Sequence, residues 1–185
     1  MPEFNQQMPI HSLAVFCGSK SGNNPLYTKH AEELGNLLAI QKITLIYGGG
    51  GKGIMKPLAD AAMAGGGKVT GVITTQLLDW EHQHKGITEL TVVNDMHTRK
   101  KTMYDLCDAA MVLPGGLGTL DEFFEMLTWN QLAIHDKRIF ILNSAGFFDH
   151  LLAHINKLEM EGFLYESAKE RITVLANPQQ LLQHL

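Results

Sequence analysis

The sequence predicts an α/β fold: a single Rossmann-like domain with a mostly parallel sheet and helices on both faces. The first reason is that short apolar runs alternate with helical segments along the chain, an order typical of parallel β-α units. The second is that three of the apolar runs end in glycine- or serine-rich turns. The third is that 185 residues without a linker or repeat suit one domain over residues 1–185, with residues 1–11 expected to be flexible.

Seven apolar segments are predicted as strands, at residues 13–17, 43–47, 68–73, 90–93, 109–113, 138–142 and 172–175. Helices are predicted at residues 25–41, 54–64, 97–106, 120–134, 147–160 and 179–185. The first helix has the clearest start, because Asn24 can cap it and Pro25 suits its first position. The fifth strand is continuously apolar, which is typical of a strand buried inside a parallel sheet.

Composition narrows the class of protein. Charged residues make up 18% of the chain, the net charge is −4, and the longest basic run is Arg99-Lys100-Lys101. These features argue against binding of a nucleic-acid polymer, although not against a single nucleotide. Two cysteines without a CxxC pair favour a reducing compartment, and no apolar run approaches the ~20 residues that span a bilayer. We therefore expect a cytoplasmic protein that does not bind membranes.

Several cofactor motifs are absent or incomplete. The nine histidines show no metal-ligand spacing, so no metal is predicted. Residues 48–53 (GGGGKG) fit GxGxxG, but the next predicted strand lacks the acidic residue that would hold a ribose hydroxyl, so NAD is not expected. Neither Gly-Lys pair is followed by Ser or Thr, which excludes a Walker A loop. No cofactor is predicted.

Glycine-rich turns follow three predicted strands, at residues 17–19 (CGS), 47–51 (YGGGG) and 114–116 (PGG). Because ligands bind outside the carboxyl ends of parallel strands, three such turns would form a floor for a phosphorylated ligand. Tight turns without a ligand would also explain any one of them. The third turn leads into a helix, whose free N–H groups would bind an anion.

Thr119 and Glu122 allow two interpretations. The spacing T-x-x-E is a capping box, in which each side chain satisfies the backbone N–H of the other residue. Alternatively, the Thr119 hydroxyl and the glycine N–H groups hold a phosphate while Glu122 faces the ligand. The helix N-terminus would then favour the ionised carboxylate, as suits a general base.

Arg99 and Lys100 are predicted in the first turn of a helix. A solvated basic turn would explain them. Cations at a helix N-terminus oppose the macrodipole, however, so an anionic partner is the other explanation. Glu81 and Thr128 carry no signal of their own.

Together these segments resemble one known family. Residues 114–122 read PGGLGTLDE and match the PGGxGTxxE signature of the LONELY GUY family, the cytokinin riboside 5′-monophosphate phosphoribohydrolases. The likeness covers nearly the whole chain and includes residues 15–19, 47–50, 96–100 and 128–137. The chain departs from the family pattern at Lys52, Lys56, Thr74, where proline is common, and Ala133, where glycine is common.

The resemblance implies that Arg99 and Glu122 are the catalytic pair. Together with the glycine turns, it predicts a nucleotide site that contains Gly18, Ser19, Gly48, Gly49, Gly50, Glu81, Met96, Arg99, Lys100, Gly115, Gly116, Leu117, Gly118, Thr119, Leu120, Asp121 and Thr128. Met96 and Trp129 are candidates for the base pocket. Family members are typically dimers with the site near the interface, and the apolar content of residues 123–132 favours such an interface.

The implied reaction is hydrolysis of the N-glycosidic bond of N6-substituted adenosine 5′-monophosphates, which releases free base and ribose 5-phosphate. Two alternatives stay open. One is a nucleotide- or cofactor-carrying protein of the same fold without turnover, and the other is a nucleosidase for ordinary AMP. A carrier needs the phosphate cradle but not both Arg99 and Glu122, so this pair favours an enzyme.

Overall fold

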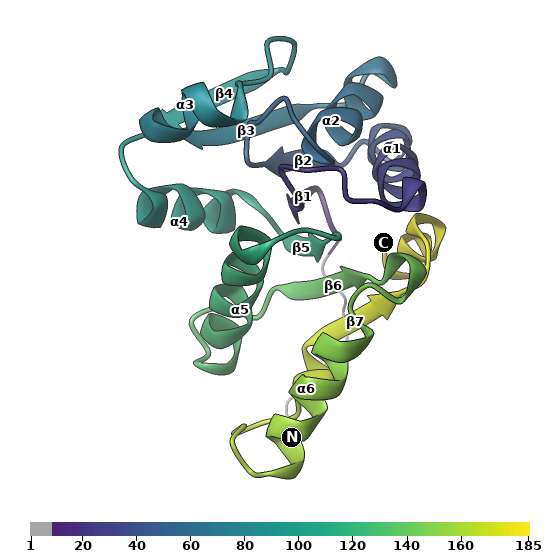
Figure 1. Cartoon of the computed structure of the whole chain (residues 1–185), viewed down its shortest axis with the longest axis vertical. Helices are drawn as coiled ribbons and strands as arrows, with labels where there is room; N and C mark the ends of the chain where they lie inside the picture. Colours follow the sequence, from purple (N-terminus) through teal and green to yellow (C-terminus); the bar gives the residue numbers. More distant parts are fainter. Residues whose placement is uncertain (1–8) are drawn as a thin grey trace.

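A computed structural model describes residues 9–185, apart from the side chains of Asp79 and Glu81. Within this part of the chain, parallel strands form one seven-stranded sheet in the order β4-β3-β2-β1-β5-β6-β7 (Figure 1). The strands are β1 (Ser12–Phe16), β2 (Thr44–Tyr47), β3 (Val69–Thr74), β4 (Glu89–Val93), β5 (Ala109–Val112), β6 (Arg138–Leu142) and β7 (Ile172–Leu175). The predicted α/β class is confirmed.

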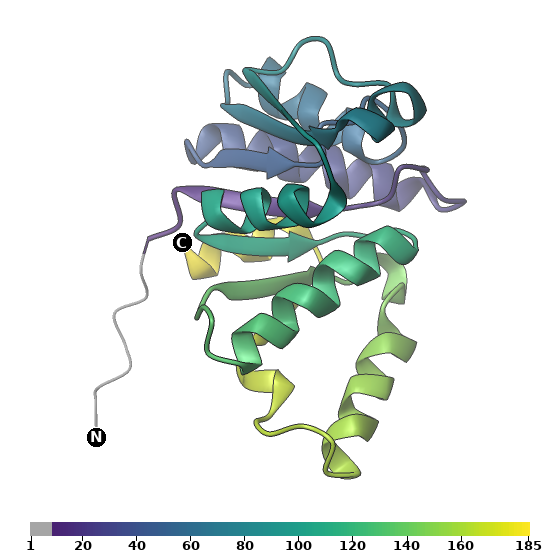
Figure 2. The ribbon, with the colours of Figure 1, turned by 90° about the vertical axis from the view of Figure 1, so that its left-hand side faces the viewer.

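Helices cover both faces of the sheet (Figures 1 and 2). One face carries α1 (Pro25–Ile40), α2 (Met55–Ala64) and the 3₁₀ helix η3 (Pro178–His184). The other carries α4 (Met96–Leu106), α5 (Leu117–Gln131) and α6 (Asp149–Met160). Shorter helices are α3 (Thr75–Glu81), η1 (Ser144–Gly146) and η2 (Ala168–Glu170). None of the helices in residues 9–185 has the length and apolar character needed to cross a bilayer.

Each face of the sheet has its own buried apolar cluster, and β1 contributes to both. Leu13 and Val15 pack in the cluster under α1 and α2, whereas Ala14 and Phe16 pack in the cluster under α4, α5 and α6. This division follows from strand geometry, because successive side chains point to opposite faces. It explains why the central strands are apolar at every position.

The direction of the connections reverses between β1 and β5. β1 leads to α1 on one face, and its neighbour β5 leads to α5 on the other. The carboxyl ends of the two strands lie side by side, since Val15 pairs with Met111 and Phe16 with Val112. Open α/β sheets bind ligands in the crevice at such a reversal. The fold therefore brings the turns at residues 17–19 and 114–116 together.

Three helical segments differ from the prediction. α3 was not expected; it starts where the Thr74 hydroxyl accepts a hydrogen bond from the Leu77 N–H at 3.3 Å, as an N-cap does. α5 begins at Leu117 rather than Leu120, because Gly116 takes the extended N-cap conformation. The C-terminal helix is a 3₁₀ helix rather than an α-helix.

The N-terminal segment expected to be flexible is described only in part. Residues 1–8 lie outside the described residues. Ile10 is buried in the core cluster, and the His11 N–H donates to Asp108 Oδ2 at 2.8 Å. The chain is therefore tied to the sheet from Ile10 onward.

Ala133 ends α5 in a left-handed conformation, with φ of 55°. The Ile134 N–H donates to Trp129 O at 2.9 Å and closes the helix as in a Schellman motif. Glycine adopts this conformation without the Cβ clash. We expect Ala133→Gly to raise the free energy of unfolding by up to about 1 kcal/mol. Urea denaturation measures the free energy of unfolding. Ala61→Gly, in the interior of α2, is a control that should lower it. If Ala133→Gly also lowers it, the left-handed conformation of Ala133 carries no strain.

Candidate active site

The turns after β1 and β5 contact each other where the connections reverse. The Gly18 N–H donates to Pro114 O at 3.1 Å, and the Leu113 N–H donates to Phe16 O at 2.9 Å. Position 115 requires glycine, because a Cβ there would overlap the Thr119 side chain. Two cavities open beside this contact and share Gly18, Ser19 and Gly116.

The first cavity contains both residues of the predicted catalytic pair, and we call it the Arg99–Glu122 cavity. Its volume is about 330 Å³, which is within the range of small-molecule sites. The wall is built by the ends of β1 and β2, the first turns of α2, α4 and α5, and α3. Its residues are Val15, Phe16, Cys17, Gly18, Ser19, Gly48, Met55, Leu77, Met96, Arg99, Gly116, Leu117, Gly118, Thr119 and Glu122.

The N-terminus of α5 forms part of this wall and has no side-chain cap. Its N-cap is Gly116, and Thr119 is the third residue of the helix, 4% exposed. The capping-box interpretation of Thr119 and Glu122 is therefore wrong. The N–H groups of the first turn have no intrahelical acceptor, and at Gly116 and Gly118 a Cβ would meet only open space. Such a terminus attracts anions.

Arg99 is fixed at the cavity wall by β3 and by the turn after β2. Its side chain is buried, Nε donates to Val72 O at 2.9 Å, and Nη2 donates to Gly48 O at 3.0 Å. A side chain at position 48 would overlap the guanidinium group, which explains the glycine there. The sheet thus holds a guanidinium group beside the cavity. Gly48, which is far from Arg99 in sequence, leaves the space that this group occupies.

Glu122 comes from α5 and is only 8% exposed. The buried Tyr104 of α4 donates its hydroxyl to the Glu122 carbonyl oxygen at 3.0 Å. Burial raises the pKa of Tyr104, and the negative charges of Glu125 and Glu122 raise it further, so this hydroxyl remains a donor at neutral pH. The cavity therefore combines a carboxylate, a guanidinium group and an uncapped helix N-terminus.

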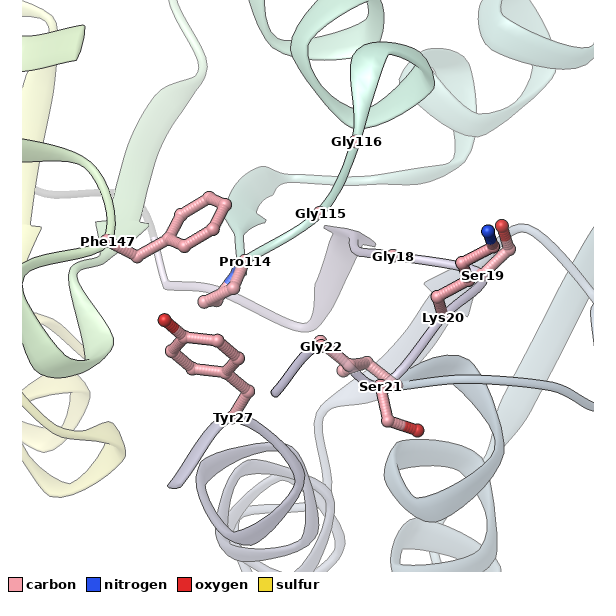
Figure 3. Close-up of a pocket in the computed structure, with 11 residues that line it drawn as sticks. Gly18, Ser19, Lys20, Ser21, Gly22, Tyr27, Pro114, Gly115, Gly116 and Phe147 are labelled. Atoms are coloured by element: carbon pink, nitrogen blue, oxygen red, sulfur yellow. The ribbon is translucent and has the colours of Figure 1, made fainter. Parts of the chain in front are cut away.

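The second cavity lies beside the Gly115–Gly116 turn (Figure 3), and we call it the aromatic cavity. Its volume is about 380 Å³. Tyr27 of α1 and Phe147 after η1 meet edge to face with ring centroids 5.5 Å apart, and Figure 3 shows both rings next to Pro114. Gly115 lines this cavity rather than the Arg99–Glu122 cavity.

Among the described residues, several predicted site residues line neither cavity. Thr128 is exposed in the second half of α5, and Leu120 packs against the core cluster. Gly49 and Gly50 shape the turn after β2, where Gly49 has φ of 75° and Gly50 pairs with Gln83. The remaining members of this group are Lys100 and Asp121, which pair with each other at 3.0 Å.

Two further residues predicted for the site are Glu81 and Trp129. Glu81 is the last residue of α3, and its side chain lies outside the described residues. Trp129 was a candidate for the base pocket, but it packs against the core with its ring 5.2 Å from that of Tyr104. Trp129 is therefore partly buried against the core and lines neither cavity.

Sequence reasoning missed the apolar part of the Arg99–Glu122 cavity. Phe16, Cys17, Met55 and Leu77 line it in addition to Met96. Leu77 was missed because α3 was not predicted. The Thr74 hydroxyl that caps α3 was the available signal, since Thr is a preferred N-cap residue. The described part of the chain contains no group of three or more His, Cys, Asp or Glu side chains placed to hold a metal ion.

Comparison with known proteins places the chain in a family. The family model described as "possible lysine decarboxylase" matches residues 55–185. A cytokinin riboside 5′-monophosphate phosphoribohydrolase of Rhodococcoides fascians is 43% identical over 164 residues, which is 88% of this chain and 83% of the relative. The chain belongs to the LONELY GUY family. A phosphoribohydrolase of the same name from Arabidopsis thaliana is 42% identical over 94% of this chain and 80% of its own length.

Solved structures of proteins outside this group of relatives share the fold. A molybdenum cofactor binding protein of Rippkaea orientalis has a TM-score of 0.71 at 21% identity and covers 95% of both chains. The molybdenum cofactor carrier protein of Chlamydomonas reinhardtii has a TM-score of 0.70 at 17% identity and covers 93% of both. At this identity the likeness is one of fold alone.

Proposed function

We propose that this member of the LONELY GUY family hydrolyses the N-glycosidic bond of adenosine 5′-monophosphates, including N6-substituted ones, to free base and ribose 5-phosphate. The observation that carries the proposal is the placement of Arg99 and Glu122 on the wall of one cavity, beside the uncapped N-terminus of α5. The names of the relatives at about 40% identity support the same reaction.

The phosphate is assigned to the N-terminus of α5. Its first-turn N–H groups, at Leu117, Gly118 and Thr119, would donate hydrogen bonds, and the helix dipole would favour the negative charge. The absence of a side-chain cap leaves these donors available. A phosphate bound there fixes the substrate at a point remote from the reacting bond, so its binding energy can orient the ribose.

Glu122 is assigned to the reacting carbon. When the bond between C1′ and the base nitrogen breaks, positive charge develops on the ribose, as in glycoside hydrolysis. A carboxylate stabilises that charge and can take a proton from the attacking water. The water oxygen then bonds to C1′, and the leaving base ends protonated on its nitrogen. Arg99 attracts the anionic substrate.

The base is assigned to the apolar side of the same cavity. Met55, Leu77 and Met96 contribute thioether and aliphatic surface there, and Met side chains adapt well to flat ring systems. No cofactor or metal takes part in this scheme.

The carrier alternative shares the fold and the phosphate site but predicts no product. We expect purified protein incubated with AMP or N6-isopentenyl-AMP to release adenine or N6-isopentenyladenine, with an equal amount of ribose 5-phosphate. Chromatography of the mixture separates the outcomes, because a carrier would bind the nucleotide and return it intact. The ratio of kcat/KM for the two substrates decides between the N6-substituted and ordinary nucleotide as preferred substrate.

We also infer a homodimer, as the family resemblance implies. Phe123, Met126 and Leu127, which belong to the apolar segment 123–132, are buried within one chain, so they do not support it. Leu132 and Ile134 after α5 are instead 59% and 61% exposed. Light scattering at micromolar protein should give twice the 20.5 kDa of one chain. A mass of one chain would refute the dimer.

The cytoplasm is the proposed compartment. Cys17 and Cys107 form no disulfide, which fits the reducing environment expected from the sequence.

A further inference from the structure

α3 forms part of the wall of the Arg99–Glu122 cavity but is not anchored in the core of the fold. It lies near the β4 end of the sheet (Figure 1) and contributes Leu77 to the cavity. Leu77 and Leu78 are half-buried and belong to neither core cluster, and the other side chains that the structure describes in this helix are exposed. A helix of seven residues is not stable without further contacts. The position of this wall therefore depends on what holds α3.

Hydrogen bonds hold both ends of the helix. At its start, the Thr74 hydroxyl accepts from the Leu77 N–H. Near its end, Lys52 Nζ donates to Trp80 O at 3.0 Å. Lys52 belongs to the turn after β2, the turn whose Gly48 carbonyl holds Arg99. The second bond therefore ties α3 to a part of the chain that already positions a site residue.

Residues 82–84, which follow α3, lie against the same turn, and we call them the strap. The Gly51 N–H donates to His82 O at 2.7 Å, and the His84 N–H donates to Gly49 O at 3.0 Å. A Cβ at position 51 would lie 2.7 Å from His82 O, so glycine there permits the close approach. The strap thus fixes the carboxyl end of α3 against the turn after β2.

Asp60 of α2 holds the strap from a second side. Its Oδ1 lies 2.8 Å from His84 Nε2, and its Oδ2 pairs with Lys56 one turn earlier. Because the Gly86 N–H donates to His84 Nδ1 at 3.1 Å, Nε2 carries the proton of the neutral ring and donates it to Asp60. Burial alone would raise the pKa of Asp60, but the hydrogen bonds from Lys56 and His84 lower it below its ordinary value. The carboxylate is therefore an ionised acceptor at neutral pH.

We propose that Lys52 and Asp60 are positioning residues that hold α3 and the strap against the turn after β2, and that the wall so formed sets the affinity of the cavity for the base of the nucleotide. The proposal rests on the proposed function, in which Leu77 contacts the base. Lys52, Lys56 and Thr74 are positions at which the chain departs from the family pattern, and each of them contacts α3 directly or acts on the strap through Asp60.

The physical reason is the low local stability of such an element. Segments held by exposed hydrogen bonds rather than by core packing open at a small cost in free energy. The apparent affinity of a ligand falls with the fraction of molecules in which its site is complete. Opening of α3 removes Leu77 from the base side of the cavity, whereas the phosphate is assigned to the N-terminus of α5. The loss should therefore fall on ligands that carry a base.

The test uses the double variant Lys52→Met/Asp60→Ala. Its KM for AMP should rise about threefold to tenfold, with kcat changed less than about twofold. The inhibition constant of ribose 5-phosphate, the product without a base, should also change less than about twofold. Lys52→Arg, which keeps the donor, should retain the KM of the unchanged protein. The matched control is Lys85→Met/Asp105→Ala, because Lys85 is exposed just after the strap and Asp105 pairs with Lys101 on α4; it should leave all three constants unchanged.

Hydrogen exchange followed by mass spectrometry tests the contacts themselves. Amides of residues 75–84 should exchange faster in Lys52→Met/Asp60→Ala, while those of α5 keep their rates. Unchanged exchange in residues 75–84, or an unchanged KM for AMP, would overturn the proposal. An equal loss of affinity for ribose 5-phosphate would overturn it as well, because that result would assign Lys52 to the phosphate rather than to the wall.

Failure of the proposed function gives a different result. If the unchanged protein releases no base from AMP, the proposed function fails, and calorimetric Kd values of AMP and ribose 5-phosphate then test the wall without turnover. The same selective loss of AMP affinity is expected there. Thermal unfolding of each variant confirms that it is folded at the assay temperature.

Discussion

Glu122→Gln should fold and bind AMP like the unchanged protein, yet release base at least about a hundredfold more slowly, because a general base alone contributes ~10²–10⁴-fold. Glutamine matches glutamate in size, and the contact from Tyr104 is to the backbone carbonyl, which the change leaves in place. Only the carboxylate charge is lost. Steady-state kinetics of base release and calorimetry of AMP binding measure the two effects separately.

Glu32→Gln is the control for this experiment, since Glu32 is exposed on α1 and belongs to neither site cavity. It should retain full activity. Near-normal turnover in Glu122→Gln would assign the carboxylate a structural role only. A helix-capping role no longer provides that alternative, because Gly116 is the N-cap of α5.

Adenosine should be a far poorer substrate than AMP. Two hydrogen bonds from first-turn N–H groups of α5 to a charged phosphate are worth about 1.5–3 kcal/mol each, which corresponds to at least about a hundredfold in kcat/KM. The comparison is made at equal enzyme concentration with and without EDTA. Comparable turnover of adenosine and AMP would contradict the phosphate assignment, and loss of activity in EDTA would contradict a metal-free reaction.

The sequence predicted best the strands and turns, because backbone geometry allows few conformations for such segments. The continuous apolar strands and the turns after them predicted the sheet, and the reversal between β1 and β5 then brings the turn at Gly18 against that at Gly115. Arg99 and Glu122 were predicted as a catalytic pair through the PGGxGTxxE resemblance, and both line one cavity.

What could not be predicted depends on contacts between residues far apart in sequence. The pairing of Lys100 with Glu125 requires the position of α4 relative to α5, and the anchoring of Arg99 requires carbonyl groups from β3 and from the end of β2. Leu77 reached the cavity wall on a helix too short to show a periodic pattern. Trp129 was misassigned because its spacing does not distinguish a base pocket from the core that it joins beside Tyr104.

The central claim is that this cavity adds water to C1′ of a nucleoside 5′-monophosphate. Its most direct test is the reaction of the purified protein with AMP in ¹⁸O-labelled water, followed by mass spectrometry of all products. Hydrolysis of the glycosidic bond predicts unlabelled adenine and an equal amount of ribose 5-phosphate carrying one label on C1′, with no label in the phosphate. Intact AMP after prolonged incubation, or labelled inorganic phosphate together with adenosine, would contradict it.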